Sequence, residues 1–285
     1  MKKLFCLLAL IALPAFAAEK APAPAVLRVG TFNIRVPNDP PPNNWAMRFP
    51  RVKALLQKQP LDIIGMQETT AKQLDDLLTL PGWASIGVAR EDGIRRGEFS
   101  NILFRRDRLE KIGYGTFWLS ETPDVPGSIS WKSACRRICT WGRFRDRLTG
   151  NIFCFVNTHL DHVSQEARTN GLTLIVERMK TICQEGEPVI LTGDFNMTYN
   201  NPALRQLDAK FLDVRQKEHG GKFLDNTPTY TGFGRQKTDV IIDYIFRTPD
   251  LQVIKCGVEA DNTKGYPSDH NLVWAELAFP QKKAE

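Results

Sequence analysis

Four apolar segments of the chain each end in polar side chains. These segments are residues 27–33, 63–68, 153–159 and 189–196, and their runs of apolar and β-branched residues predict strands that are buried on both faces. In open α/β sheets, ligands bind beyond the carboxyl ends of the strands, so the four endings are expected at one rim. The polar residues at or just after these endings are Asn33, Glu68, His159, Asp161, Asp194 and Asn196.

The segment 189–196 ends in the sequence Gly193-Asp194-Phe195-Asn196. Glycine allows a sharp turn where the strand leaves the sheet. Asp194 and Asn196 are two residues apart, so in extended backbone both side chains point the same way. A carboxylate beside an amide at the end of a strand suits a metal-bound anion better than it suits a hydrophobic core.

Two later segments have the opposite order, with the polar residues first and the apolar run afterwards. They are residues 239–246 and 268–274, and their polar positions include Asp243, Asp269 and His270. Strands that run antiparallel to the first four would bring these side chains to the same rim from their beginnings. The pattern therefore predicts a mixed sheet.

Helices are predicted between these strands from apolar residues at helical spacing. Residues 48–59 form one helix that Pro60 stops, Thr69 or Thr70 caps a second, and residues 164–184 form the longest. Residues 143–153 are predicted to form a hairpin and residues 120–133 a long loop. This order of strands and helices is typical of α/β architecture, and we expect one domain over residues 26–280.

The first residues have the pattern of a secretory signal. Lys2 and Lys3 precede an apolar run, and Ala15-Phe16-Ala17 supplies the small residues that a signal peptidase needs. A membrane anchor is the competing interpretation, but the apolar run is shorter than a bilayer requires. We therefore expect a signal peptide over residues 1–17, a linker over residues 18–25, and an exported monomer, periplasmic or secreted, with no transmembrane segment in the mature protein.

Charge and cysteine content narrow the chemistry further. Without Lys2 and Lys3 the chain has 36 basic and 32 acidic residues, a formal charge of +4 instead of +6. This mildly basic balance permits an anionic substrate without requiring nucleic acid. The five cysteines that remain form no CxxC pair and no zinc-binding spacing, and we expect none of them to be functional.

The carboxylates predicted at the rim need compensating positive charge. Neighbouring carboxylates raise each other's pKa unless a cation or an imidazolium is present. Carboxylates and amides without cysteine select a hard cation such as Mg²⁺ or Mn²⁺. A histidine paired with a carboxylate can activate a water molecule, and a charged histidine can stabilise negative charge on a phosphoryl group.

Taken together, six motifs resemble the ordered motifs of the endonuclease/exonuclease/phosphatase superfamily. The resemblance extends over residues 27–279 and implies a four-layer α/β/β/α sandwich of two mixed sheets, as in deoxyribonucleases. It is specific for the superfamily but not for the substrate. The motifs are Thr31-Phe32-Asn33, Gln67-Glu68, Asn157-Thr158-His159-Leu160, Gly193-Asp194-Phe195-Asn196, Ile242-Asp243-Tyr244-Ile245 and Ser268-Asp269-His270.

The resemblance also implies roles for these residues. Glu68 is implied as the main metal ligand, with Asn33 and Asp269 as further ligands or close supports. Asp243 is implied to orient His270, and either His270 or Asp194 is the base that activates water. Asn196 is implied to hold a phosphate oxygen.

His159 is similar to a histidine found in deoxyribonuclease-like, sphingomyelinase-like and deadenylase-like members but typically absent from bacterial AP endonucleases. Residues 98–105 resemble the strand whose glutamate braces that histidine, so we expect Glu98 to pair with His159. The histidine and the expected export both argue against repair of abasic sites.

Residues 117–123 and 137–141 are most similar to an uncharacterised bacterial branch of the superfamily. Within them, Arg137 is expected either to clamp a phosphate or to make a structural ion pair. Trp118 and Trp131 are expected to cover the edge of a sheet, with stacking on a substrate ring as the alternative.

The sequence thus predicts an exported divalent-metal-dependent phosphoesterase in which water attacks phosphorus in line. A phosphodiester substrate is favoured, with a nuclease first. Sugar-phosphate or sphingomyelinase-like phospholipid substrates are the alternatives, because basic residues are scattered and not grouped in a groove. A non-catalytic binding module is the remote alternative.

Overall fold

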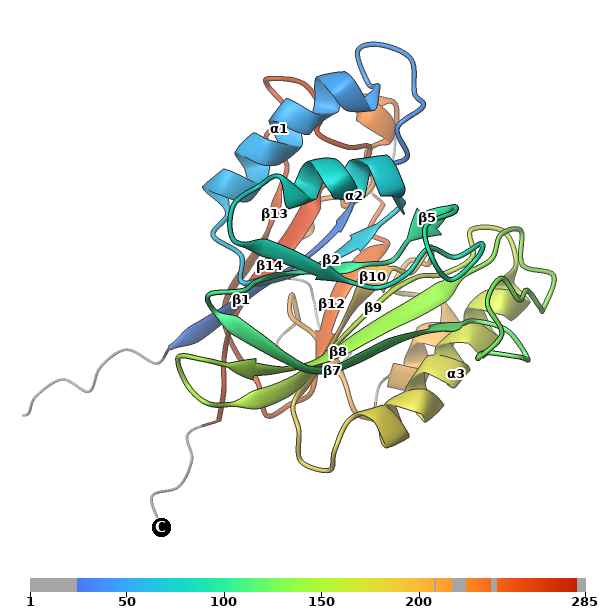
Figure 1. Cartoon of the computed structure of the whole chain (residues 1–285), viewed down its shortest axis with the longest axis vertical. Helices are drawn as coiled ribbons and strands as arrows, with labels where there is room; N and C mark the ends of the chain where they lie inside the picture. Colours follow the sequence, from blue (N-terminus) through green and yellow to red (C-terminus); the bar gives the residue numbers. More distant parts are fainter. Residues whose placement is uncertain (1–24, 208, 217–223, 237–239, 281–285) are drawn as a thin grey trace, which may run out of the picture.

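Two six-stranded sheets lie face to face, with helices on both outer sides (Figure 1). The computed structural model describes residues 25–207, 209–216, 224–236 and 240–280. The expected signal peptide over residues 1–17 lies outside these ranges, as does the expected linker except for its last residue. Within the described residues, no helix is both long and apolar enough to span a membrane.

The first sheet has the strand order β13-β14-β1-β2-β6-β4. β1 and β2 are parallel, and β14 runs antiparallel to β1, as the sequence pattern predicts. The strands are β1 (Val26–Asn33), β2 (Ile63–Gln67), β4 (Trp83–Ile86), β6 (Ile102–Arg105), β13 (Gln252–Glu259) and β14 (Leu272–Ala278).

The second sheet has the strand order β11-β12-β10-β9-β8-β7. β9 and β10 are parallel, and β12 runs antiparallel to β10. The strands are β7 (Leu109–Trp118), β8 (Ile138–Asp146), β9 (Ile152–His159), β10 (Val189–Asp194), β11 (Leu212–Asp213) and β12 (Asp243–Arg247). A small separate sheet pairs β3 (Thr69–Thr70) with β5 (Glu98–Phe99).

The helices form close to their predicted positions. Asn44 caps α1 (Trp45–Lys58), Thr70 caps α2 (Ala71–Leu78) and Ser164 caps α3 (Gln165–Ile182). Two short 3₁₀ helices, η1 (Pro202–Leu207) and η2 (Gly232–Gly234), lie in the connections of the second half. Figure 1 shows α1 and α2 together on one side of the sheets and α3 on the other.

Three clusters of buried apolar residues correspond to the three interfaces between the four layers. One packs α1 and α2 on the first sheet, one fills the space between the sheets, and one packs α3 on the second sheet. The structure is therefore the α/β/β/α sandwich that the resemblance implies. The hydrophobic pattern alone predicts the strands and their directions, but it does not divide them between two sheets.

A polar network connects the sheets just behind the strand ends. Asn157 in β9 donates from Nδ2 to the carbonyls of Met66 (2.8 Å) and Asn101 (3.1 Å). Its Oδ1 accepts from Gln67 Nε2 (2.7 Å) and Thr192 Oγ1 (3.1 Å). Because Asn157 is fully buried and all four hydrogen bonds are made, the network fixes the relative position of β2, β9 and β10.

We expect Asn157→Ala to reduce the free energy of unfolding by about 2 to 4 kcal/mol, because its buried partners would lose their hydrogen bonds. Urea unfolding of the variant and the wild type measures this difference. Asn200→Ala, at an exposed position, is the control and should leave the midpoint unchanged. Equal midpoints for all three proteins would show that the network does not hold the sheets together.

Candidate active site

The strand ends that carry the predicted polar residues meet at a single pocket of about 420 Å³. Eight of the eleven predicted site residues line it, and Asn33, Asp161 and Asp243 lie outside its lining. The eight are Glu68, Glu98, Arg137, His159, Asp194, Asn196, Asp269 and His270. A slightly larger hollow of about 480 Å³ beside Trp83 and Arg105 contains none of the predicted residues, so its size does not make it the site.

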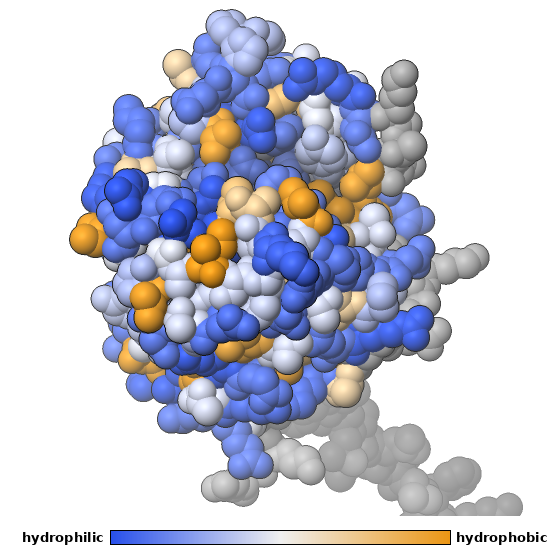
Figure 2. Space-filling model, turned by 90° about the vertical axis from the view of Figure 1, so that its right-hand side faces the viewer, coloured by the Kyte–Doolittle hydropathy of each residue, from blue (hydrophilic) through white to orange (hydrophobic). Residues whose placement is uncertain are grey.

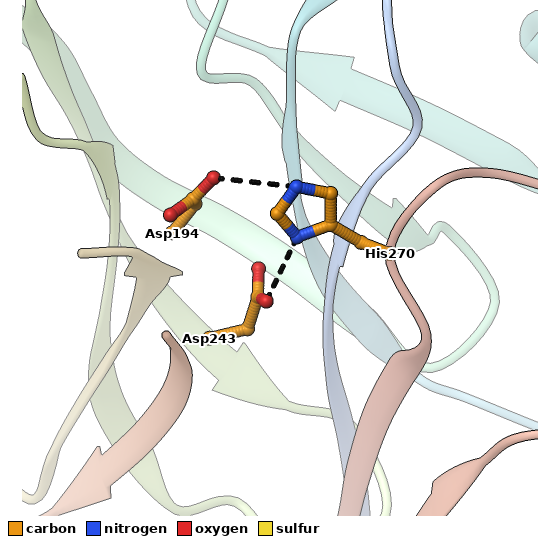
Figure 3. A group of neighbouring side chains, drawn as sticks. All are labelled: Asp194, Asp243 and His270. Atoms are coloured by element: carbon orange, nitrogen blue, oxygen red, sulfur yellow. Dashed lines mark hydrogen bonds and ion pairs between the residues drawn. The ribbon is translucent and has the colours of Figure 1, made fainter. Parts of the chain in front are cut away.

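At the centre of the site, His270 lies between two carboxylates from neighbouring strands (Figure 3). His270 Nδ1 donates to Asp243 Oδ2 at 2.9 Å, and His270 Nε2 is 3.7 Å from Asp194 Oδ2. Burial opposes the charged imidazole, but the charge of Asp243 and the hydrogen bond to it raise the pKa of His270 to about 10. His270 is therefore an imidazolium at neutral pH.

Asp194 is a buried carboxylate whose pKa lies near neutral pH. Its burial, and next the charge of Asp243, raise the pKa of Asp194 to about 7. The imidazolium of His270 and the hydrogen bonds from Asn33 and Asn196 act in the opposite direction. Asp194 can therefore accept and release a proton under ordinary conditions.

The same three residues have ligand atoms within 4.8 Å of one another, a spacing that a metal ion could use. However, a protonated imidazole has no lone pair to offer a metal, and His270 is already hydrogen-bonded to Asp243. The arrangement fits a charged histidine oriented by an aspartate better than it fits a metal centre.

On the other side of Asp194, His159 is held in the neutral state. Its burial, and next the positive charges of Arg137 and Arg90, place the pKa of His159 well below its usual value. His159 Nε2 consequently accepts a hydrogen bond from Asn196 Nδ2 at 3.0 Å and lies 3.4 Å from Asp194 Oδ2. The two histidines that flank Asp194 thus have opposite charge states.

The backbone at Asn196 differs from the extended conformation expected after β10. Asn196 has a φ of 49°, and its backbone N–H donates to Asp194 Oδ1 at 2.9 Å. The chain therefore turns back toward the carboxylate that precedes it. Asn196 lines the pocket, as predicted. It reaches the pocket through this turn, and not because alternate residues of an extended strand point the same way.

The residues implied as metal ligands lie together on the side of the first sheet. Burial, and in addition the negative charge of Glu68, raises the pKa of Asp269, so a cation between these two carboxylates would relieve their repulsion. Asn33 Nδ2 donates to Glu68 Oε1 and to Asp194 Oδ2, both at 3.0 Å, and Asn33 Oδ1 accepts from the N–H of Arg35. The oxygen donors of Glu68 and Asp269 fit Mg²⁺ or Mn²⁺, whereas Asn33 supports the carboxylates.

The expected pairing of Glu98 with His159 is wrong. Both carboxylate oxygens of Glu98 accept from Arg90, each at 2.7 Å, and no hydrogen bond joins Glu98 to His159 among the described residues. A planar guanidinium satisfies both oxygens at once, which a single imidazole nitrogen cannot do. Arg90 lies in a loop eight residues before Glu98, and spacing in the sequence alone does not indicate this pair.

Arg137 lines the pocket, and Asp161 lies next to it outside the lining. Arg137 is only 5% exposed, and it is 2.9 Å from His162 Nδ1 and 3.7 Å from Asp161 Oδ1. Its Nε and Nη1 are buried and have no hydrogen-bond partner among the described residues. Asp161 accepts from the backbone N–H groups of Val163 and Ser164, so it stabilises the turn before α3.

Trp118 has a structural position and not a stacking one. It is buried, and its indole N–H donates to the carbonyl of Arg90 at 2.7 Å. Neither Trp118 nor Trp131 lines the pocket. The pocket lining also includes residues that the motifs did not single out, among them Arg35, Arg90, His162 and Tyr230. The ring of Tyr230 lies 4.9 Å from that of His270.

Comparison with known proteins connects this geometry with one family. The family model described as "Endonuclease/Exonuclease/phosphatase family" matches residues 30–270. An endonuclease/exonuclease/phosphatase structure from Bacteroides vulgatus is 37% identical, with a TM-score of 0.82 over 90% of this chain and 99% of that one. A mannosyl-6-phosphatase from Bacteroides thetaiotaomicron is 34% identical, with a TM-score of 0.81 over 89% of this chain and 100% of that one.

More distant similarities are found to a solved structure and to curated sequences. The human nocturnin catalytic domain has a TM-score of 0.72 at 16% identity, over 89% of this chain and 94% of that one, which shows the fold alone. Among curated proteins, an uncharacterised protein of Acanthamoeba polyphaga mimivirus is 24% identical over 71% of this chain and 79% of its own length. Drosophila melanogaster nocturnin is 26% identical over 77% of this chain, which spans only 39% of that protein.

The contact between Asp243 and His270 predicts the charge state of the histidine. We expect Asp243→Asn to lower the pKa of His270, because the variant removes the carboxylate that raises it. The wild-type ring should stay protonated as the pH rises through 8, and the variant ring should be neutral there. Nitrogen NMR of labelled histidine follows the titration. A wild-type His270 that already loses its proton near pH 6.5 would contradict this assignment.

Proposed function

The chain belongs to the endonuclease/exonuclease/phosphatase family and is a phosphoesterase-type hydrolase, and from this premise we propose that it is a divalent-metal-dependent phosphatase of phosphorylated sugars. The observation that carries the proposal is the size and chemistry of the pocket. Its volume of about 420 Å³ lies in the lower part of the range for small-molecule sites. Most side chains that line it are charged or polar, which suits the hydroxyl groups of a sugar.

The pocket lacks features that a nuclease is expected to have. Tyr230 is the only aromatic residue in its described lining apart from the histidines, and its ring faces His270. Nucleases that hold single strands usually stack bases on several aromatic side chains beside a basic groove. The likeness to a mannosyl-6-phosphatase over the whole length of that chain further supports a sugar phosphate.

A phospholipid substrate receives less support. An enzyme that works on a membrane needs an exposed apolar patch with which to bind it. The face shown in Figure 2 is mostly hydrophilic, and its apolar residues form only small groups. Ile94 and Val163, exposed by 68% and 64%, are each flanked in the sequence by glycine or polar residues.

The residues around the pocket suggest a division of roles during hydrolysis. Bound between Glu68 and Asp269, Mg²⁺ or Mn²⁺ would polarise the phosphate ester and offset its charge. Asp194 is positioned to take the proton of the attacking water, because its raised pKa makes it a base near neutral pH. The imidazolium of His270 can stabilise the charge that develops on the phosphate oxygens. The P–O bond of the ester breaks, and the products are inorganic phosphate and the free sugar with its hydroxyl group restored.

Hydrolysis by the purified mature protein in Mg²⁺ tests this proposal. Mannose 6-phosphate should release phosphate, supercoiled plasmid should remain intact, and a chelator should stop the reaction. Asp194→Asn should lower kcat by about 10² to 10⁴ while the fold is retained. Asp261→Asn, an exposed match for the same substitution, should retain full activity. Nicking of plasmid that Asp194→Asn abolishes, without phosphate release from sugars, would instead establish the nuclease that the sequence favours.

Export is proposed from the first seventeen residues alone. A charged start, an apolar run and the small residues Ala15 and Ala17 support cleavage after Ala17. When the full chain is expressed in a Gram-negative host, periplasmic protein should begin at Ala18. Recovery of only uncleaved protein from the cytoplasm would contradict export.

A further inference from the structure

Arg35 lies among the carboxylates that are expected to hold the metal. Its Nη1 is 3.7 Å from Glu68 Oε2, and its Nε is 3.7 Å from Asp269 Oδ2. Arg35 also makes the shorter contacts of an ion pair with Asp39, whose oxygens accept from Nε at 3.1 Å and from Nη2 at 3.4 Å. One guanidinium therefore faces three carboxylates, two of which are the proposed metal ligands.

The backbone of Arg35 is fixed so that the side chain points this way. Arg35 has a φ of 58°, a left-handed conformation that non-glycine residues adopt only where their surroundings impose it. Its N–H donates to Asn33 Oδ1 at 2.9 Å, and its carbonyl accepts from Arg48 Nη2 at 3.0 Å and Gln73 Nε2 at 2.7 Å. Because Arg48 and Gln73 are completely buried, the position of Arg35 is set by the core and not by solvent.

Arg35 and a bound divalent cation would compete for the negative charge of Glu68 and Asp269. Glu68 and Asp269 lie in a site where their side chains are only 13% and 8% exposed, so water screens them poorly. A positive charge at 3.7 Å from each lowers the free energy that a divalent cation gains there. Asp39 limits this effect, because it makes the only contacts of the guanidinium within hydrogen-bond distance among the described residues.

We propose that Arg35 sets the affinity of the site for its divalent cation by sharing Glu68 and Asp269 with it, and that Asp39 restrains Arg35. This inference rests on the proposed function, because it takes these carboxylates as the metal ligands. The guanidinium lines the pocket and its side chain is 37% exposed, so its remaining N–H groups can face a substrate phosphate. Phosphate that neutralises Arg35 then favours the cation, and metal and substrate strengthen each other's binding.

Calorimetric titration of the full mature protein with Mn²⁺ tests the inference without a turnover assay. Arg35→Met should lower the Kd for Mn²⁺ by about five- to fiftyfold, because a positive charge is removed from beside the ligands. Arg35→Lys keeps the charge and should remain within about threefold of the wild type. Arg95→Met, which removes an exposed arginine paired with Asp75, is the matched control and should leave the Kd unchanged.

Asp39→Asn has the opposite expected sign. Without Asp39, the charge of Arg35 acts fully on Glu68 and Asp269, so the Kd for Mn²⁺ should rise. If Asp39 acts through Arg35, the effect should be smaller in the Arg35→Met background than in the wild type, which a double-mutant cycle measures. Equal effects in both backgrounds would overturn the restraining role of Asp39.

The outcomes separate the inference from the proposed function. If the wild type binds no Mn²⁺ at this site, the metal-dependent function itself is wrong. If the wild type binds Mn²⁺ and Arg35→Met, shown to be folded by its unfolding midpoint, binds it with the same or weaker affinity, the role of Arg35 is wrong and the function stands. Tighter binding by Arg35→Met with unchanged affinity in Arg95→Met supports the inference.

Discussion

Negative charge that is buried where the two sheets meet is the constraint on which the site depends. Asp194 is 2% exposed and Asp243 is completely buried, and neither could remain ionised there without compensation. His270 lies between them, and the amide of Asn33 donates to Asp194. Behind Asp243, the buried guanidinium of Arg215 donates to its backbone carbonyl at 3.0 Å. The positive charges and hydrogen-bond donors around the two carboxylates therefore compensate their burial, and the folded structure supplies them.

The register of the second sheet places these groups in one row. In β10, Asp194 is opposite His159 of β9 on one side and opposite Asp243 of β12 on the other. A shift of one residue in either pairing would turn a site residue into the core, since alternate side chains face opposite sides of a sheet. The first sheet supplies Glu68 and Asp269 from the facing side, and the network around Asn157 holds the two sheets in place. Precise strand pairing, more than any single contact, thus assembles the site.

How much of the fold and of the site could be predicted from the sequence depends on how far apart in the chain the interacting residues lie. Strand endings such as those of β2 and β10 were found because apolar runs that stop in polar residues are a local signal. The division of the strands between two sheets is not predicted from the hydrophobic pattern, because the pairing of strands that are distant in the sequence produces no local pattern in one sequence. The same limit explains Glu98, whose partner is set by a loop that folds back and brings Arg90 to it. Arg35 was missed for another reason, since its orientation depends on a left-handed backbone conformation.

The two histidines on either side of Asp194 have opposite charge states. His159 is kept neutral by burial and by the positive charges of Arg137 and Arg90, whereas His270 is kept charged by Asp243. Asp194 lies between them, and its pKa of about 7 makes it the member of the row that can change its proton occupancy near neutral pH. In the proposed mechanism, a water molecule beside Asp194 loses its proton to this carboxylate, while the positive charge of His270 remains available for the phosphate. The fold thus sets the charge of each histidine by its neighbours, placing His159 near Arg137 and Arg90 and His270 against Asp243.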